Sequence, residues 1–174
     1  MMDIQYPIHG LVEDLALGIL RPYFEGTGVT VATTFTEVTK LPLVMARQDK
    51  KSGKATVYSA DPRFSRAALL SIDTICQGID ADERAVHLQE AVTQAIFEAQ
   101  AKQITVPGVG YISRIENMGV ASRASDWATS TGVVQYASLP QGAVRYDNTV
   151  RLHIRPDRNQ SLARQDNPFL RKTT

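Results

Sequence analysis

Apolar residues recur at three- and four-residue intervals in two stretches of the chain, and this spacing predicts two helices. The first covers residues 8–23, and Pro22 is expected to end or kink it because proline lacks a backbone donor. The second runs from Asp80 or Asp82, either of which can cap its first turn, to about Gln103. Its apolar face is rich in small residues, which predicts close packing on a sheet: Ala85, Leu88, Val92, Ala95, Ile96 and Ala99.

Alternating or short apolar runs predict the strands, many of them rich in β-branched residues. These runs cover residues 29–35, 41–48, 66–76, 111–118 and 148–155. Turn signals at Ser52-Gly53 and Asp61-Pro62 indicate an extended, basic hairpin arm over residues 49–62, in which ATVYS is a further strand candidate.

The order of these elements is helix, two or three strands, helix and two strands, with short connections between neighbouring strands. Such connections favour antiparallel pairing. We therefore predict an α+β fold, in which a mainly antiparallel sheet of four to five strands carries both helices on one face. Residues 1–156 are expected to form this domain, and residues 157–174 a polar C-terminal arm.

The bulk composition fits a single globular domain, with 174 residues and a hydrophobic share of 43%. No run approaches the roughly 18 apolar residues that a membrane helix needs, and the N-terminus lacks the features of a signal peptide. We therefore expect a soluble protein made in a cytoplasm, without a membrane partner. The single cysteine, Cys76, excludes an internal disulfide, and its apolar surroundings in the sequence predict a buried structural thiol.

Basic residues are concentrated at the C-terminal end of the chain. The net charge is only +1, yet the residues from Arg145 onward include seven basic and three acidic side chains. Two interpretations stay open: a solvated basic tail, or an arm that docks on an acidic partner or a phosphate. Since no basic groove interleaved with aromatic residues accompanies them, sequence-specific recognition of nucleic acid is not expected.

The sequence offers no recognisable set of catalytic, cofactor-binding or metal-binding residues. His9, His87 and His153 are far apart, and none has a second ligand at metal-binding spacing. The glycines of VPGVGY lack the following helix and lysine of a phosphate-binding loop, and no serine lies in a nucleophile elbow. Nothing in these patterns favours an enzyme, although one with unmarked catalytic groups stays open.

The stretch DWATSTGVVQYASLPQGAVRY, residues 126–146, differs from the rest of the chain. It contains the only tryptophan, is longer than the usual connection of about 4–6 residues, and is too rich in aromatic residues for a disordered segment. Large aromatic side chains are favoured where proteins meet proteins. We interpret the stretch as a binding surface with these candidate contact residues: Asp126, Trp127, Tyr136, Leu139, Pro140, Arg145 and Tyr146.

The segment GYISRIE, together with SDWATSTGVVQYASLPQGAVRYDNTVRLHIRP further on, resembles tail terminator (tail completion) proteins of long-tailed bacteriophages. The phages concerned are in particular those that infect mycobacteria and their relatives. The resemblance covers most of residues 8–156, is specific in residues 126–156 and is only topological elsewhere. Beyond Pro156 no shared pattern is found.

This resemblance implies a non-enzymatic structural protein of the virion without a cofactor. Such proteins form a hexameric ring that caps the last ring of tail-tube subunits and then presents a surface to the head connector. The implied location is the neck-proximal end of the tail, after assembly in the host cytoplasm. The implied partners are other copies of the chain, the major tail-tube protein and the head-to-tail connector or head-closure protein, with the tape measure protein and DNA in the lumen as further candidates.

A closed ring needs a heterologous interface, in which one patch meets a different patch on the next subunit. Trp127, Tyr136, Leu139, Pro140 and Tyr146 are the candidate anchors of that interface, with Arg145 and Asp126 as its charged partners. The alternative for each is packing over its own sheet. In the hairpin arm, the basic side chains are predicted to reach the tube or the lumen, with a solvated tip as the alternative: Lys50, Lys51 and Lys54.

Three other functions remain open at this stage. A head-closure or adaptor ring of the phage neck would share the size and composition. A small ligand-binding or enzymatic α+β domain would need a deep pocket with convergent polar groups. A DNA-binding protein that uses the basic C-terminal end would bind with steep salt dependence.

Overall fold

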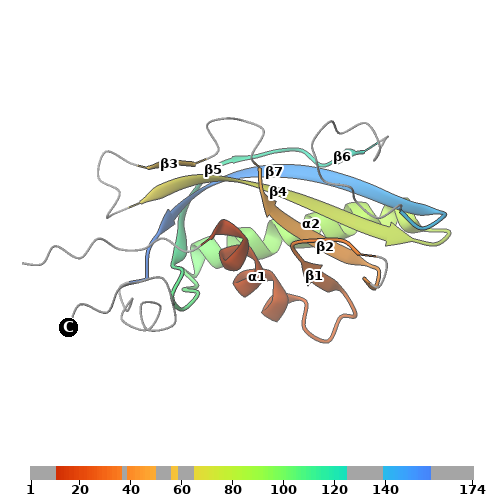
Figure 1. The fold of residues 1–174 in the computed structure, drawn as a ribbon, viewed down its shortest axis with the longest axis horizontal. Helices are drawn as coiled ribbons and strands as arrows, with labels where there is room; N and C mark the ends of the chain where they lie inside the picture. The colour runs from red at the N-terminus through yellow and green to blue at the C-terminus, as the bar shows by residue number, and fades with distance from the viewer. Residues whose placement is uncertain (1–10, 37–38, 50–55, 59–64, 125–138, 158–174) are drawn as a thin grey trace, which may run out of the picture.

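The computed structural model describes residues 11–36, 39–49, 56–58, 65–124 and 139–157. Two helices lie on one face of a long, curved sheet, which confirms the predicted α+β fold (Figure 1). In chain order the elements are α1 (Val12–Tyr23), β1 (Thr30–Ala32), β2 (Leu43–Gln48), β3 (Thr56–Tyr58), β4 (Arg66–Gln77), α2 (Ala81–Ala101), β5 (Tyr111–Met118), β6 (Ser122–Arg123) and β7 (Ala143–Arg155).

The sheet has seven strands in the order β1-β2-β4-β7-β5, with β3 paired to β4 and β6 paired to β7. Because β4 and β7 pair with each other along their whole lengths, β2 and β3 share the other edge of β4, and β5 and β6 share the other edge of β7. The sheet is therefore five strands wide, and two of the five positions are each occupied by two separate strands, β2 with β3 and β5 with β6. Every pairing is antiparallel except that between β1 and β2.

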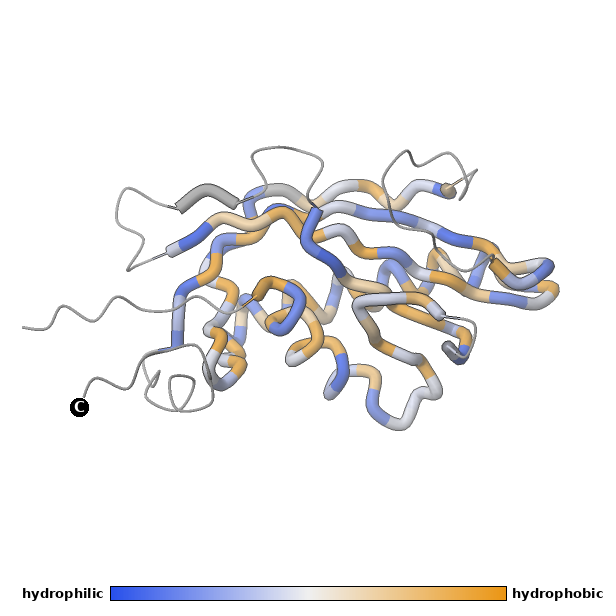
Figure 2. Tube along the Cα trace, viewed as in Figure 1, coloured by the Kyte–Doolittle hydropathy of each residue, from blue (hydrophilic) through white to orange (hydrophobic). Residues whose placement is uncertain are grey.

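The main core lies between the helices and the sheet. On the sheet side it contains apolar residues at alternate positions of β4 and β7, including Leu70, Ile72, Val150, Leu152 and Ile154. Figure 2 shows the corresponding alternation of hydrophobic and hydrophilic positions along both strands. The apolar face predicted for α2 is buried in full.

Both helices end close to the predicted residues, but α1 begins at Val12, four residues after the predicted start at residue 8, because Leu11 is extended with a φ of −68° and a ψ of 146°. α1 ends at Tyr23, one residue after Pro22. α2 begins after Asp80 as predicted, yet the Asp80 side chain makes no capping hydrogen bond. The carboxylates of Asp82 and Glu83 in the first turn still suit the positive end of the helix dipole.

Two predicted strands differ from the structure. Regular pairing of β1 covers three residues instead of the predicted 29–35. The bounds of β5 are as predicted, but two register shifts against β7 break its alternation. Strict alternation would place Ile112 and Ile115 on opposite faces of the sheet. Because of the register shifts, Ile112 is buried in the main core, and Ile115 and Met118 also contact this core.

β7 begins at Ala143, five residues before the predicted start at residue 148. Arg145 and Tyr146 are consequently strand residues rather than parts of a loop. The predicted strand within the hairpin arm is present as β3, which pairs antiparallel with the start of β4.

Cys76 is buried, as predicted, and burial raises the pKa of its thiol more than nearby Arg84 lowers it. Because the reactive species is the thiolate, we expect native protein to react with an aromatic disulfide reagent more than about tenfold more slowly than the unfolded chain. The rate should be followed by absorbance with and without denaturant. Equal rates in the two conditions would show that the thiol is accessible in the folded protein.

Candidate subunit interface

The structure describes four of the seven candidate interface residues. Leu139, Pro140, Arg145 and Tyr146 are placed, whereas residues 126, 127 and 136 lie outside the described residues. The three lysines of the hairpin arm also lie outside them, so the predicted contact of Lys50, Lys51 and Lys54 with a tube or lumen stays a prediction.

Leu139 and Pro140 precede a tight turn that starts β7. The amide of Ala143 donates to the carbonyl of Pro140 at 3.0 Å, and Gly142 adopts a φ of 75°, which glycine allows without strain. The Pro140 side chain is exposed, while the half-buried Leu139 packs against a second, smaller core. Leu139 thus packs over its own sheet, which is the alternative that the sequence analysis gave to a contact with another subunit.

This second core lies on the sheet face opposite the helices, which we call the open face. It contains four buried side chains: Phe35, Leu43, Met45 and Ile75. The alternation along β4 places Ile75 on this face because its neighbours Thr74 and Cys76 point toward the helices.

Arg145 belongs to a buried ion-pair cluster beside that core. Its Nε and Nη2 atoms lie 2.8 Å and 2.7 Å from Oδ1 of Asp73, while Nη2 of Arg47 lies 3.3 Å from Oδ2. The side chain of Asp73 is 0% exposed and that of Arg145 is 14% exposed. The cluster joins three neighbouring strands, β2, β4 and β7, through side chains alone. Asp73 is thus the charged partner of Arg145 observed within the chain, while the pairing predicted with Asp126 lies outside the described residues.

Tyr146 points to the other side of the sheet, toward the helices. It packs half-buried against the main core, and burial, followed by the nearby Asp82 carboxylate, raises the pKa of its hydroxyl. Its carbonyl accepts a hydrogen bond from Nε2 of Gln89 at 3.3 Å. Arg145 and Tyr146 therefore lie on opposite faces of one strand and do not form a single patch.

A second polar network lies at the other end of the open face. Oε2 of Glu116 is 2.7 Å from Nε2 of His153 and 3.5 Å from Nε of Arg151. The hydrogen bond from His153 is the main cause that lowers the pKa of Glu116. The open face therefore has a small apolar core near the start of β7, a buried ion-pair cluster beside it and an exposed charged network near the end of β7.

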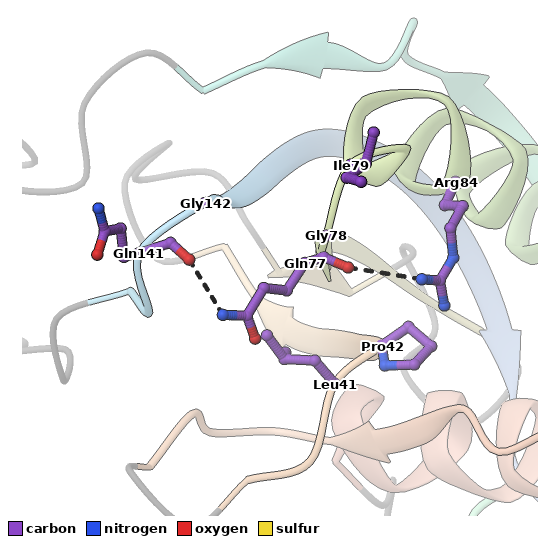
Figure 3. A pocket seen from close by; sticks show the side chains of 8 residues that line it. All are labelled: Leu41, Pro42, Gln77, Gly78, Ile79, Arg84, Gln141 and Gly142. Atoms are coloured by element: carbon purple, nitrogen blue, oxygen red, sulfur yellow. Dashed lines mark hydrogen bonds between the residues drawn. The ribbon is translucent and has the colours of Figure 1, made fainter.

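An open hollow of about 610 Å³ lies where β4 ends and β7 begins (Figure 3). Nε2 of Gln77 donates to the carbonyl of Gln141 at 3.0 Å, and this bond joins the two strand ends across the hollow. Next to it, the side chain of Ile79 is fully exposed in the turn between β4 and α2. Sequence reasoning did not select this region, since the only signal was one isoleucine in a polar turn.

Within the described residues, no group of three or more histidine, cysteine, aspartate or glutamate side chains is arranged to hold a metal ion. No helix in the same part of the chain is long and apolar enough to cross a membrane. Comparison with models of known protein families finds no match, and no curated protein matches the chain at a significant level.

Proposed function

We propose that this chain is a structural protein of a bacteriophage tail that assembles into a hexameric ring. The ring caps the last ring of tube subunits, ends elongation of the tail and provides the surface that joins it to the head connector. The proposal rests first on the resemblance of residues 126–156 to tail terminator proteins.

The observation in the fold that supports the proposal is the two-sided character of the sheet. Both helices cover one face, and no described helix covers the other, on which the alternate positions of β7 from Arg145 to Arg155 are all polar or charged. A subunit with two different long faces can bind the next subunit head-to-tail, as a ring requires.

The contact roles proposed from the sequence fit this arrangement in part. Pro140 is exposed at the turn before β7 and is available to a neighbouring subunit. Arg145 is held by Asp73, so it would contribute to a subunit interface mainly by positioning that turn. Trp127 and Tyr136 remain proposed anchors, and the lysines of the hairpin arm remain proposed contacts with the tube or the lumen.

Particle mass and negative-stain electron microscopy of the purified chain, with and without tail-tube protein, test the proposal. We expect rings, and we expect them at one end of each tube. Trp127→Ala should abolish the rings while circular dichroism shows a folded monomer, since permanent interfaces depend on a few buried aromatic anchors. Rings that form normally from Trp127→Ala would refute the role of this tryptophan. A chain that stays monomeric and never binds tube ends would refute the function.

A further inference from the structure

The outer surface of α2 has an acidic stripe. Side chains exposed at three- and four-residue intervals run along the whole helix, namely those of Glu83, His87, Glu90, Gln94, Phe97 and Ala101. Phe97 is 47% exposed, so one large apolar side chain lies within the polar stripe. A single exposed aromatic residue is common on monomeric proteins and decides nothing alone. The charges of the stripe are more informative.

α2 contains four carboxylates and one arginine, and two of the carboxylates already have partners. Glu98 binds Lys102 at 2.7 Å, and Asp82 binds Arg123 of β6 at 3.3 Å. Glu83 and Glu90 form no ion pair within the described part of the chain. Both belong to the exposed stripe, so two carboxylates on the outer surface of α2 are available to a partner.

The open face of the sheet has the opposite charge balance. Within the described strands, five arginines and three carboxylates lie on this face: Arg47, Arg114, Arg145, Arg151 and Arg155, and Asp73, Glu116 and Asp147.

The carboxylates of the open face leave two of these arginines available. Asp73 binds Arg47 and Arg145, and Glu116 binds Arg151. Arg114 and Arg155 are exposed and have no ion pair among the described residues. They lie near each other where β5 pairs with the end of β7.

The two surfaces lie on opposite sides of the subunit, and the helix is the shorter of the two. A helix of 21 residues extends about 31 Å, and a strand of 13 residues extends about 43 Å, so α2 of one molecule fits along β7 of another. Figure 1 shows α2 on one side of the sheet and the open face on the other. This placement suits a head-to-tail contact, which closes into a ring when each step adds a rotation.

The edges of the sheet are poorly suited to joining subunits by continued strand pairing. β1, at one edge, pairs over only three residues. β5, at the other edge, is broken by two register shifts and carries the exposed charges of Arg114 and Glu116. Bulges, charges and short strands are the features by which proteins prevent edge-to-edge association. A contact between faces is therefore favoured over a contact between edges.

We propose that the acidic stripe of α2 in one subunit docks on the basic open face of the next, with Glu83 and Glu90 opposite Arg114 and Arg155. The partner is a second copy of this chain. The inference rests on the proposed function only in that both require a ring, and it adds which surfaces form the ring. Complementary charges fix the orientation of such a contact, while like charges brought together across it are strongly unfavourable.

Two charge-reversal variants test the contact. One carries Glu83→Lys and Glu90→Lys, and the other carries Arg114→Glu and Arg155→Glu. Each variant alone should associate at least about a hundredfold more weakly than wild type, since like charges then face each other at every contact. Native mass spectrometry should show monomers at a concentration where the wild type forms rings. Because all four side chains are exposed, melting curves should show that both variants remain folded.

An equimolar mixture of the two variants should restore rings. Each contact in such a ring joins one variant to the other, so the two must alternate and the ring must have an even number of subunits. All four reversals in one chain should restore rings as well. Glu25→Lys with Lys40→Glu, which reverses two exposed charges away from both surfaces, is the matched control and should assemble as the wild type does.

The outcomes separate this contact from the proposed function. If either two-residue variant alone still forms wild-type rings, or if neither the mixture nor the fourfold variant restores them, the contact is wrong while the ring and its function stand. A wild-type chain that forms no ring with or without tail-tube protein overturns both.

Discussion

Asp73→Ala should lower the free energy of unfolding by about 3–5 kcal/mol, because it removes a fully buried carboxylate that forms ion pairs with two arginines. The substitution breaks the ion pairs of this carboxylate with Arg47 and Arg145 in a site from which water is largely excluded. Removing one partner of a buried ion pair is costly because the other partner keeps its charge in a poorly hydrated site. Urea denaturation followed by circular dichroism would measure the loss.

Asp147→Ala is the matched control for this substitution. Asp147 lies directly opposite Asp73 in the pairing of β4 with β7, but its hydrogen bond to the hydroxyl of Ser122, 2.8 Å long, is exposed. Its removal should cost less than about 1 kcal/mol, as exposed polar contacts contribute little. If the two variants unfold at the same urea concentration, the cluster around Asp73 does not stabilise the fold as argued.

The elements with a strong period could be predicted from the sequence alone. α2 and β4 combine long regular patterns with turn residues at both ends, and the buried face of α2 was predicted residue by residue. β5 was predicted in its bounds but not in its faces, because a register shift depends on the strand beside it. Nothing in the local sequence around Ile115 shows that β7 will pair with it out of phase.

The candidate site could be predicted less well, for two physical reasons. The helix-facing positions of β7 include Tyr146 and Asn148, so the alternation of apolar residues is weak before residue 150. From the sequence alone, the first residues of the strand were therefore assigned to a loop. The partner of Arg145 is Asp73, which is 72 residues earlier in the chain. Only the topology of the sheet brings these two side chains together, and no spacing rule could have found the pair.

Gly110→Ala should lower the free energy of unfolding by about 3 kcal/mol or more, the second large effect expected. Gly110 has a φ of 132°, a conformation that residues with a Cβ rarely adopt. A Cβ at this position would collide with the carbonyl oxygen of Arg155. Since that atom belongs to the backbone of β7, no side-chain movement can relieve the clash, and the pairing of β5 with β7 would have to open.

Gly26→Ala separates the two causes of this loss. Gly26 also has a positive φ, 77°, but no atom lies within 4 Å of the position that its Cβ would occupy. It should cost only about 1 kcal/mol, the strain of the backbone conformation alone. Thermal unfolding of both variants gives the difference, and equal losses would mean that the β5–β7 junction tolerates the extra atom. Arg114 and Arg155 flank that junction, so a Gly110→Ala protein that remains folded should also form rings less well than Gly26→Ala.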